Sequence, residues 1–418
     1  MNNNFFQPFP ETRDSDAVNV LTIAASFPSL IQPWLVNHLV QIIRHGGDNR
    51  IVSRREEKAV FTDAIVENNL LEKYWCVGDD KIELLRDYIK AMADKPLRQR
   101  TQQLMRNYNA KDRSVKMRIF DKLSSPVFAC NPDIIHSHSE PAGARFIKLI
   151  QANKAPLVMT FHGLPPVGVA HITDAQRNEY TATAEAIFVN TEFAKQQYIS
   201  LGAPEEKFII VPQGIDLSRW PLQQRPFPEN GTVNLLTVGR LHPDKGHRYA
   251  LDAVKKLVDQ GHDIQYTIVG SGPEKENIAT KADGLGIGDR IRIHSAIPDK
   301  QLAEIYRQSH IFVLPSLRSK DGFHEETQGV VLQEAQATGL ITIATRSGGI
   351  PECIDDGKSG YLVPDRDADA LASAIDAVIN KKDEWLNIQA AARQWVEHHY
   401  SADKIGDRMN AYYRDIIR

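Results

Sequence analysis

Short apolar runs alternate with helix-like patterns along the whole chain, and this alternation restricts the possible folds more than any other feature. A buried strand followed by an amphipathic helix, repeated many times, is typical of a parallel sheet with helices on both faces. The sequence therefore predicts a doubly wound α/β fold. Its expected strands are residues 18–25, 133–136, 157–161 and 186–190 in the first half, and 233–238, 264–269, 291–294, 311–314, 341–344 and 360–363 in the second.

A polar, proline-rich stretch separates these strands into two sets. Residues 220–231 have the sequence WPLQQRPFPENG and show neither helical nor strand periodicity, which is typical of a linker. A chain of 418 residues is also long for a single hydrophobic core. We therefore predict an N-terminal domain of residues 1–215 and a C-terminal domain of residues 216–398.

Composition excludes several classes of protein. The net charge of -3 argues against nucleic acid as a partner. The three cysteines (Cys76, Cys130 and Cys353) are far apart and form no CxxC motif, which predicts a reducing compartment and no disulfide framework. The N-terminal residues lack the apolar core of a signal peptide, and no run of eighteen apolar residues occurs. We expect a cytoplasmic protein.

Charged and polar residues follow the predicted strands at their carboxyl ends, where open α/β sheets bind their ligands. Arg240 follows the first strand of the second half, and residues 316–326 follow the strand at 311–314. In the first half, His138 and His162 occupy the same kind of position. Two sheets whose carboxyl ends face one another would enclose a cleft, and we expect the site there.

Arg240 and Lys245 are the candidate phosphate-binding cations. Charged residues on such a connection are usually only solvated, but here Gly239 and Gly246 flank them and permit a close approach of the backbone. A helix is expected to begin near His247, so its N–H groups would lie beside the two cations. We expect both side chains on an exposed loop, where they would bind a diphosphate without a metal ion.

Two carboxylates, Glu326 and Glu334, are eight residues apart at the entry to another predicted helix. On one continuous helix they would be about 12 Å apart and turned by about 80°. We therefore expect Glu326 in the loop before the helix and Glu334 two turns into it. Carboxylates accept hydrogen bonds from sugar and ribose hydroxyls. With the two cations, they predict a pocket for a nucleotide diphosphate sugar.

These motifs, in this order, resemble the retaining glycosyltransferases of family 4, and most of the chain contributes to the resemblance. The resemblance implies the GT-B fold, in which two Rossmann-like domains face a cleft and residues 399–418 return to the N-terminal domain through a last helix at 402–417. The C-terminal domain would bind the nucleotide sugar and the N-terminal domain the acceptor. The matching elements are Phe27-Pro28 with Leu30, residues 133–141 (DIIHSHSEP), residues 160–163 (TFHG), residues 211–216 (VPQGID), Gly239-Arg240, Lys245-Gly246, and Glu326 with Glu334.

The resemblance also implies roles for single residues. Glu326 would contact hydroxyls of the transferred sugar, Glu334 the ribose, and His162 the sugar and its phosphate. Many relatives have glycine where this chain has Thr327, so the identity of the sugar is left open. The expected catalytic residues are His162, Arg240, Lys245 and Glu326. The expected donor-binding residues are Arg240, Lys245, Glu326, Thr327, Gln328, Gly329, Val330 and Glu334.

The implied activity is retaining, metal-independent transfer of a hexose from a nucleotide diphosphate sugar. A UDP-sugar is favoured and GDP-mannose is possible, with the nucleotide sugar as co-substrate and no other cofactor. The acceptor would be a saccharide or a lipid-linked saccharide in exopolysaccharide or lipopolysaccharide biosynthesis. A sugar-nucleotide epimerase of similar fold and a non-catalytic sugar-nucleotide-binding subunit remain alternatives. A glycogen-phosphorylase-like enzyme is disfavoured, because no motif for a pyridoxal-phosphate lysine stands out.

Three further motifs have simpler explanations. Residues 270–273 (GSGP) lack the third glycine of a dinucleotide fingerprint, and we interpret them as a tight turn. Asp365 and Asp367 resemble a metal-binding DxD but directly precede a helix, where aspartate caps the N-terminus. We therefore assign no metal. His136 and His138 are interpreted mainly as structural.

The segment from Lys81 to Lys122 is strongly basic, with twelve lysines and arginines against five acids and a net charge of +7. Within it, Leu85, Tyr88, Ile89 and Met92 recur at helical spacing. They could form the buried face of a helix whose outer face is solvated. Alternatively, apolar and basic residues together could contact anionic lipid on the inner face of the membrane.

Overall fold

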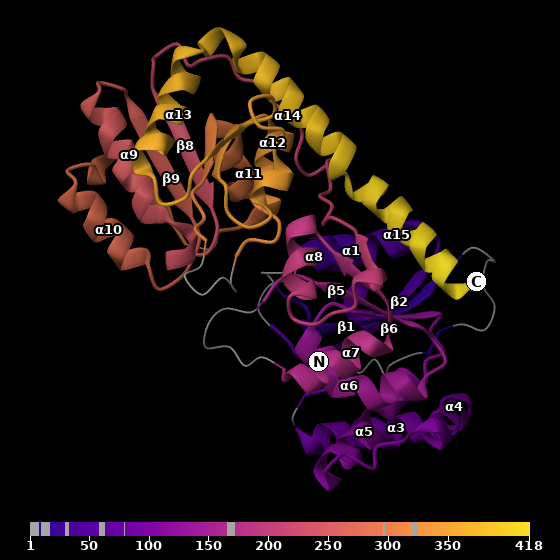
Figure 1. Cartoon of the computed structure of the whole chain (residues 1–418). Helices are drawn as coiled ribbons and strands as arrows, with labels where there is room; N and C mark the ends of the chain where they lie inside the picture. Colours follow the sequence, from indigo (N-terminus) through magenta and orange to yellow (C-terminus); the bar gives the residue numbers. More distant parts are fainter. Residues whose placement is uncertain are drawn as a thin grey trace. The chain divides into compact units, whose positions relative to one another are not determined.

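The computed structural model describes residues 8–9, 17–29, 33–57, 63–78, 80–164, 172–295, 297–318 and 325–418. Leu30 and residues 319–324, which belong to motifs named above, lie outside the described residues. The chain divides into two compact units (Figure 1). Unit 1 is Met1–Gly214 with Ile405–Arg418, and unit 2 is Ile215–Lys404.

Unit 1 contains, within its described residues, a seven-stranded sheet in which every neighbouring pair is parallel. The strand order is β3-β2-β1-β4-β5-β6-β7. This order reverses direction between β1 and β4, as in a doubly wound Rossmann-like sheet. The strands are β1 (Asn19–Ser26), β2 (Asp48–Arg55), β3 (Tyr74–Cys76), β4 (Ile134–Ser137), β5 (Leu157–Phe161), β6 (Ala184–Val189) and β7 (Phe208–Ile210).

Helices cover both faces of this sheet because each strand alternates its apolar side chains between them. One face packs on α1 and on α15, the C-terminal helix, through Ile405, Met409 and Tyr413. The return of the last helix to the N-terminal part of the chain is thus confirmed. The helices of unit 1 are α1 (Pro33–Arg44), α2 (Asp63–Glu67), α3 (Lys81–Ala93), α4 (Lys95–Asn107), α5 (Val115–Phe128), α6 (Glu140–Ala152), α7 (Asp174–Thr183), α8 (Glu192–Ile199) and α15 (Ala402–Ile417).

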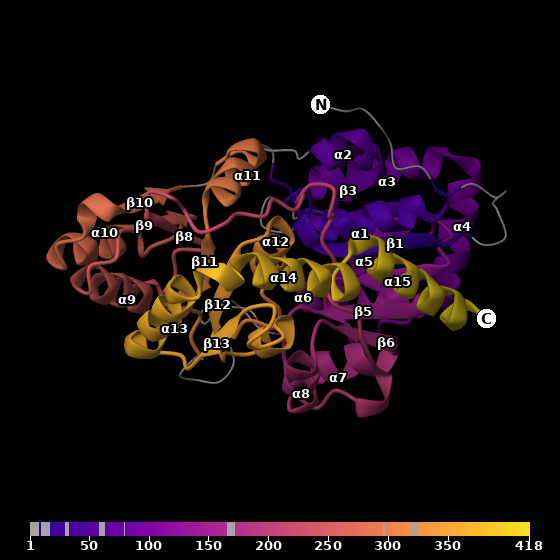
Figure 2. The same cartoon turned by 90° about the horizontal axis from the view of Figure 1, so that it is seen from above.

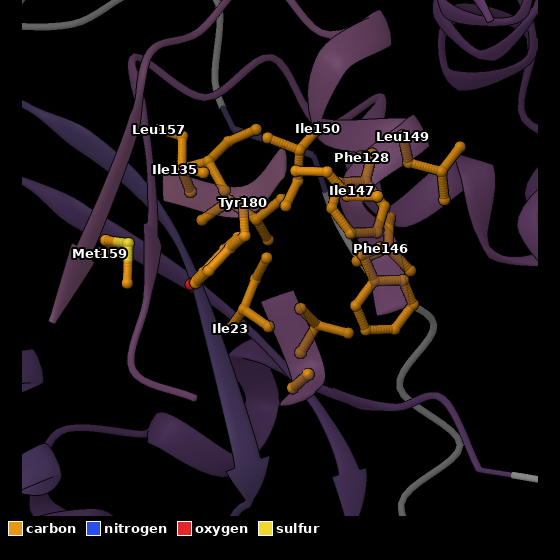
Figure 3. Close-up of a cluster of buried hydrophobic side chains, with 14 of the residues drawn as sticks. Ile23, Phe128, Ile135, Phe146, Ile147, Leu149, Ile150, Leu157, Met159 and Tyr180 are labelled. Atoms are coloured by element: carbon orange, nitrogen blue, oxygen red, sulfur yellow. The ribbon is translucent and has the colours of Figure 1, made fainter. Parts of the chain in front are cut away.

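The main core of unit 1 lies on the other face of the sheet (Figure 3). Strands β1, β4 and β5 contribute Ile23, Ile135 and Met159, while α6 contributes a row of large apolar side chains that includes Phe146. Tyr180 of α7 is fully buried beside them. This face therefore fixes α6 on the sheet, and α4 and α5 pack on α6.

Unit 2 repeats the same topology. Its described residues form a six-stranded parallel sheet of order β10-β9-β8-β11-β12-β13, which can be followed in Figure 2. The strands are β8 (Val233–Val238), β9 (Ile264–Val269), β10 (Ile291–His294), β11 (Ile311–Leu314), β12 (Ile341–Thr345) and β13 (Tyr361–Val363). The helices are α9 (His247–Asp259), α10 (Lys275–Gly284), α11 (Asp299–Gln308), α12 (Val330–Thr338), α13 (Ala368–Asn380) and α14 (Trp385–His399).

Both sheets confirm the predicted doubly wound fold, with a reversal of strand order after β1 in unit 1 and after β8 in unit 2. Three strands were missed. β2 carries three arginines, so its apolar run is interrupted, and β3 and β7 are three-residue strands at the two edges of the sheet. Within the described parts of the chain, no helix is both long enough and apolar enough to cross a membrane.

Candidate active-site residues in the two units

Arg240 follows β8 at the point where the strand order of unit 2 reverses. Its side chain is 47% exposed and pairs with Asp244, whose Oδ2 lies 3.4 Å from Nη2 of Arg240. Its carbonyl oxygen accepts a hydrogen bond from Nε2 of His247 at 3.2 Å. Arg240 is therefore held beside the first residue of α9, whose N-terminus attracts anions.

Gly246 positions Lys245. With a φ of +66° it adopts a left-handed conformation, and a Cβ atom there would lie only 1.9 Å from the carbonyl oxygen of Pro315. The N–H of Leu317 also donates to the carbonyl oxygen of Asp244 at 2.7 Å. These contacts bring the loop after β8 against the loop after β11, the neighbouring strand across the reversal.

Lys245 and Glu326 form an ion pair between these loops, through Nζ and Oε2. The exposed fractions of the two side chains are 13% and 22%. The expectation that both phosphate-binding cations lie exposed is therefore correct for Arg240 and wrong for Lys245. The loop after β11 covers Lys245 because Gly246 lets the two backbones approach so closely.

The Glu326 loop is anchored to the Gly-Gly turn after β12. The N–H of Gly349 donates to the carbonyl oxygen of Glu326 at 2.8 Å, and the N–H of Gly348 donates to Oε2 of Glu325 at 2.9 Å. Gly348 has a φ of +54°, and a Cβ atom there would lie 2.2 Å from the Glu326 carbonyl oxygen. Burial raises the pKa of Glu325. The turn thus fixes where the Glu326 side chain emerges.

The N-terminus of α12 follows this loop. Thr327 and Gln328 are buried, and Gly329 is the N-cap residue, which supplies no side-chain cap. Four backbone N–H groups here were expected to contact the donor. The N–H of Val330 instead lies 3.1 Å from the carbonyl oxygen of Gln328 and donates to it. The expected role of these backbone groups therefore stays a prediction, and for Val330 it would require the loss of this hydrogen bond.

Glu334 is the fifth residue of α12, so it lies about one turn into the helix and not two. Its Oε2 accepts a hydrogen bond of 3.0 Å from the hydroxyl of Tyr306, a fully buried residue of α11. Burial and the adjacent carboxylate raise the pKa of Tyr306 well above its ordinary value. The tyrosine therefore stays protonated and orients the carboxylate.

The DxD-like pair in unit 2 is structural. Oδ1 of Asp367 accepts from the N–H of Ala370 at 2.8 Å and caps α13, as predicted. Asp365 accepts from the backbone N–H of Arg318 at 3.1 Å and pairs with Arg366. Residues 270–273 form the expected turn after β9, which packs against the backbone of residues 239–241.

In unit 1, His162 follows β5 within a cluster of aromatic side chains. Its ring centroid is 3.9 Å from that of Trp34, and its Nε2 lies 3.2 Å from Nδ1 of His138. Nε2 of Gln213 donates to Nδ1 of His162 at 2.9 Å. With Nδ1 acting as the acceptor, the proton of the neutral His162 ring is on Nε2.

Burial keeps this histidine cluster neutral. It lowers the pKa of His162 and of His38 to about 3, and it lowers those of His136 and His138 well below the ordinary value. His136 lies between the hydroxyls of Tyr413 and Thr160, at 2.5 and 2.7 Å, so its structural interpretation is confirmed. His138 contacts His162 directly and so belongs to the candidate site.

Ring nitrogens of His38, His136 and His138 lie within 4.8 Å of one another, a spacing from which a metal ion could be bound. Both nitrogens of His136 already have hydrogen-bond partners. A metal would have to displace at least one of them. The hydrogen bonds account for the arrangement of His136, and we assign no metal to these residues.

Sequence reasoning missed three residues that orient the candidates. Asp244 holds Arg240, Tyr306 holds Glu334, and Gln213 holds His162. Asp244 could have been found, because it lies four residues after Arg240 and directly before Lys245. Gln213 belongs to the matching element at residues 211–216, but nothing in the sequence joins it to His162. Tyr306 has no such signal, and both residues meet their partners only after folding.

Two families match the chain in succession. Residues 91–219 match the family described as "Glycosyltransferase Family 4", and residues 219–395 match "Glycosyl transferases group 1". The second match includes the loops of Arg240, Lys245 and Glu326. Both matches are to glycosyltransferases, and together they cover most of the two units.

Relatives support the same assignment over nearly the whole chain. A glycosyltransferase named for colanic acid biosynthesis, WcaL of Escherichia coli (strain K12), is 26% identical over 91% of this chain and 95% of its own. The amylovoran biosynthesis glycosyltransferase AmsK of Erwinia amylovora is 26% identical over 90% and 94%. The solved structure of Anabaena HepE in complex with UDP has the same fold, with a TM-score of 0.70. It is 13% identical in sequence, and the match covers 95% of this chain and 100% of HepE. The chain is therefore a glycosyltransferase with the GT-B fold, whose residues 91–219 match glycosyltransferase family 4 and whose residues 219–395 match the glycosyl transferases of group 1.

Proposed function

We propose that this protein is a retaining glycosyltransferase that moves a hexose from a nucleotide diphosphate sugar to a saccharide or lipid-linked saccharide. A UDP-sugar is the favoured donor, and HepE in complex with UDP supports this choice. WcaL and AmsK are named for the synthesis of extracellular polysaccharides, which supports the same role here.

The observation that carries the proposal is the ion pair between Lys245 and Glu326 at the reversal of strand order in unit 2. Lys245 and Glu326 are partly buried and neutralise each other. A ligand can replace this ion pair without leaving a buried charge alone only if it offers a phosphate to the lysine and hydroxyl groups to the glutamate. A nucleotide diphosphate sugar offers both. It would exchange one protein ion pair for a phosphate contact of Lys245 and a hydroxyl contact of Glu326.

Donor binding then uses the surrounding groups. Arg240 and Lys245 would neutralise the diphosphate, with the N-terminus of α9 contributing about half a charge. Glu334, oriented by Tyr306, would accept from the ribose hydroxyls. The diphosphate needs about two positive charges, and these groups supply them without a divalent ion.

Transfer with retention is proposed to proceed by front-side displacement. The acceptor oxygen bonds to C1 of the sugar while the bond from C1 to the diphosphate breaks, and the acceptor proton passes to the departing phosphate oxygen. Arg240 and Lys245 stabilise the charge that develops on the diphosphate. We also assign His162 a catalytic role, in which its Nε2–H would exchange Nδ1 of His138 for an oxygen of the sugar or phosphate.

A panel of nucleotide sugars tests the proposal. Purified protein is incubated with each donor, and released nucleoside diphosphate is measured with and without lipid extracts that contain saccharide acceptors, in EDTA. A glycosyltransferase releases nucleotide that rises with acceptor and forms a glycosylated product, and EDTA has no effect. Acceptor-independent release would indicate an epimerase, and binding without release would indicate a non-catalytic subunit.

A matched pair of variants makes the panel specific to the proposed site. Lys245→Ala should abolish most turnover, while Lys358→Ala, a change of an exposed lysine elsewhere in unit 2, should not. Activity that disappears in EDTA and returns with magnesium or manganese would contradict the metal-independent mechanism.

A further inference from the structure

Helices α3 and α5 present apolar side chains to solvent in the most basic part of the chain. They pack against each other, and together with α4 they form a layer on the side of α6 that faces away from the sheet (Figure 1). Half of the exposed large apolar side chains among the described residues lie on these two helices. They are Ile82 (81% exposed), Leu85 (49%) and Ile89 (60%) on α3, and Val115 (63%) and Ile119 (55%) on α5.

The exposed side chains of α3 are not its packing face. Leu84 and Ala91 are buried and join the core of unit 1, whereas Leu85 and Ile89 point to solvent. The interpretation of Leu85 and Ile89 as part of a buried face is therefore wrong. Ile82, Leu85 and Ile89 are spaced by three and four residues, so they form one apolar stripe along the outer side of the helix.

Basic side chains flank this stripe. Lys81, Arg86 and Lys90 are exposed on α3, and α5 adds the exposed residues Lys116, Arg118 and Lys122. Long lysine and arginine side chains can extend beside a buried apolar stripe and keep their charges in water. An apolar stripe with a basic rim is the pattern of a helix that lies in the surface of an anionic bilayer.

Several acids of this segment have structural partners, although only Asp121 is buried. Asp121 is buried and bonded to Arg113 and Tyr108, and Asp94 caps α4. Asp112 pairs with Lys148 of α6 at 3.0 Å. Three of the five acids of residues 81–122 thus have structural partners away from the stripe. Glu83 and Asp87 remain on α3, where Asp87 pairs with Arg86 at 3.3 Å, so the six exposed cations of α3 and α5 still outnumber the acids beside them.

We infer that the outer side of α3, continued by the exposed residues of α5, docks on a bilayer surface that contains anionic lipid. Charge complementarity favours a lipid bilayer over a protein partner. Anionic headgroups can move to wherever the cations lie, and the acyl region accepts the apolar stripe between them. Docking would hold the enzyme where a lipid-linked acceptor resides. In this respect the inference rests on the proposed function.

Vesicle co-sedimentation tests the inference with the full chain. Vesicles of phosphatidylcholine alone are compared with vesicles in which half of the lipid is phosphatidylglycerol, at low and physiological salt. Binding is expected only to the anionic vesicles and is expected to weaken with salt, because salt screens the attraction. Equal binding to both kinds of vesicle, or no binding, would overturn the inference.

Two triple variants separate the apolar and basic contributions. Replacing Ile82, Leu85 and Ile89 with glutamine should weaken binding to anionic vesicles by more than tenfold, because each exposed aliphatic side chain loses its apolar contact with lipid. Replacing Lys81, Arg86 and Lys90 with glutamine should weaken it by about fivefold for each cation. All six side chains are exposed, so circular dichroism should show an unchanged fold.

Matched controls change the same residue types elsewhere. Leu222→Gln with Leu386→Gln removes exposed apolar side chains from unit 2, and a glutamine triple at Lys300, Lys358 and Lys382 removes exposed cations there. Neither control should alter vesicle binding. If the controls weaken binding as much as the α3 variants, the surface is not specific and the inference fails. The assay contains neither donor nor acceptor, so its failure leaves the proposed glycosyl transfer untouched.

Discussion

Lys245 and Glu326 lie 81 residues apart in the chain, yet they form one ion pair at the carboxyl ends of β8 and β11. The sequence predicted separate roles for them, with the lysine on phosphate and the glutamate on sugar. Because the two side chains pair, each neutralises the charge of the other, and a ligand with both chemistries would have to replace this ion pair. The pair is therefore a structural element as well as a candidate binding element.

This double role predicts coupled effects on stability. Lys245→Met and Glu326→Gln should each lower the free energy of unfolding by roughly 1–3 kcal/mol, because each leaves a partly buried charge without its partner. The double variant should lose less than the sum of the two. Urea unfolding of the three variants measures this coupling, and strictly additive losses would mean that the pair does not form in solution.

Arg240 should matter for donor binding and little for the fold. Arg240→Ala should weaken donor binding by roughly 10- to 150-fold, the loss of one charged contact. Its exposed side chain predicts an unchanged melting temperature. Asp244→Asn, which loosens Arg240 without removing it, should have a smaller effect, and Arg248→Ala on the same helix start serves as the control. Unchanged affinity of Arg240→Ala in calorimetry would remove it from the diphosphate site.

The two glutamates should separate in nucleotide binding. Glu334→Ala should weaken binding of both the free nucleoside diphosphate and the sugar donor, because its proposed partner is the ribose. Glu326→Ala should leave the affinity for the free diphosphate unchanged, because Lys245 has then lost its ion-pair partner and can bind the phosphate. The same variant should lower turnover. Tyr306→Phe should reproduce part of the Glu334 effect, by about 2- to 13-fold for one hydrogen bond. Equal losses of diphosphate affinity for both alanine variants would show that the roles are wrongly assigned.

Gln213 should act through His162. Gln213→Ala removes the amide that donates to Nδ1 of His162, so kcat should fall by about 2- to 13-fold while the donor KM changes little. His162→Ala should cost more, and combining the two should add little to it. Gln196→Ala, which removes an exposed glutamine of α8, is the control. Additive effects in the double variant would indicate that Gln213 has an independent role.

The partly buried histidines His38 and His162 predict acid sensitivity. Burial lowers the pKa of His38 and of His162 to about 3, from about 6.5 in the unfolded chain, so their contribution to stability is complete above pH 6.5. Between pH 6.5 and 3 the unfolded chain binds more protons, and stability falls by about 1.4 kcal/mol per pH unit for each histidine. Replacing His38 with glutamine should make this fall in stability less steep, by about 1.4 kcal/mol per pH unit. Denaturant titrations across this range measure the slopes.

Local patterns in the sequence determined the repeating architecture of both units. The strands β5 and β8 to β11 were predicted with their observed bounds, because short runs rich in β-branched and aliphatic residues between turn residues specify a strand. The position of Arg240, Glu326 and His162 at strand ends follows from the same runs. β2 was missed because three arginines interrupt its apolar pattern. It forms a strand because β1 and β3 pair with it on both sides.

Only the tertiary structure decided which residues meet. Lys245 pairs with Glu326, Tyr306 holds Glu334, and Tyr413 of the last helix reaches His136, each across a long stretch of chain. These contacts depend on the order of strands in the sheets and on how closely glycines let loops approach, and neither is encoded in local periodicity. The same reason applies to α3. Its apolar pattern predicted a helix, but the packing of the neighbouring helices determined that Leu85 and Ile89 face solvent. Sequence patterns specify the elements, and the relative placement of the elements specifies the site.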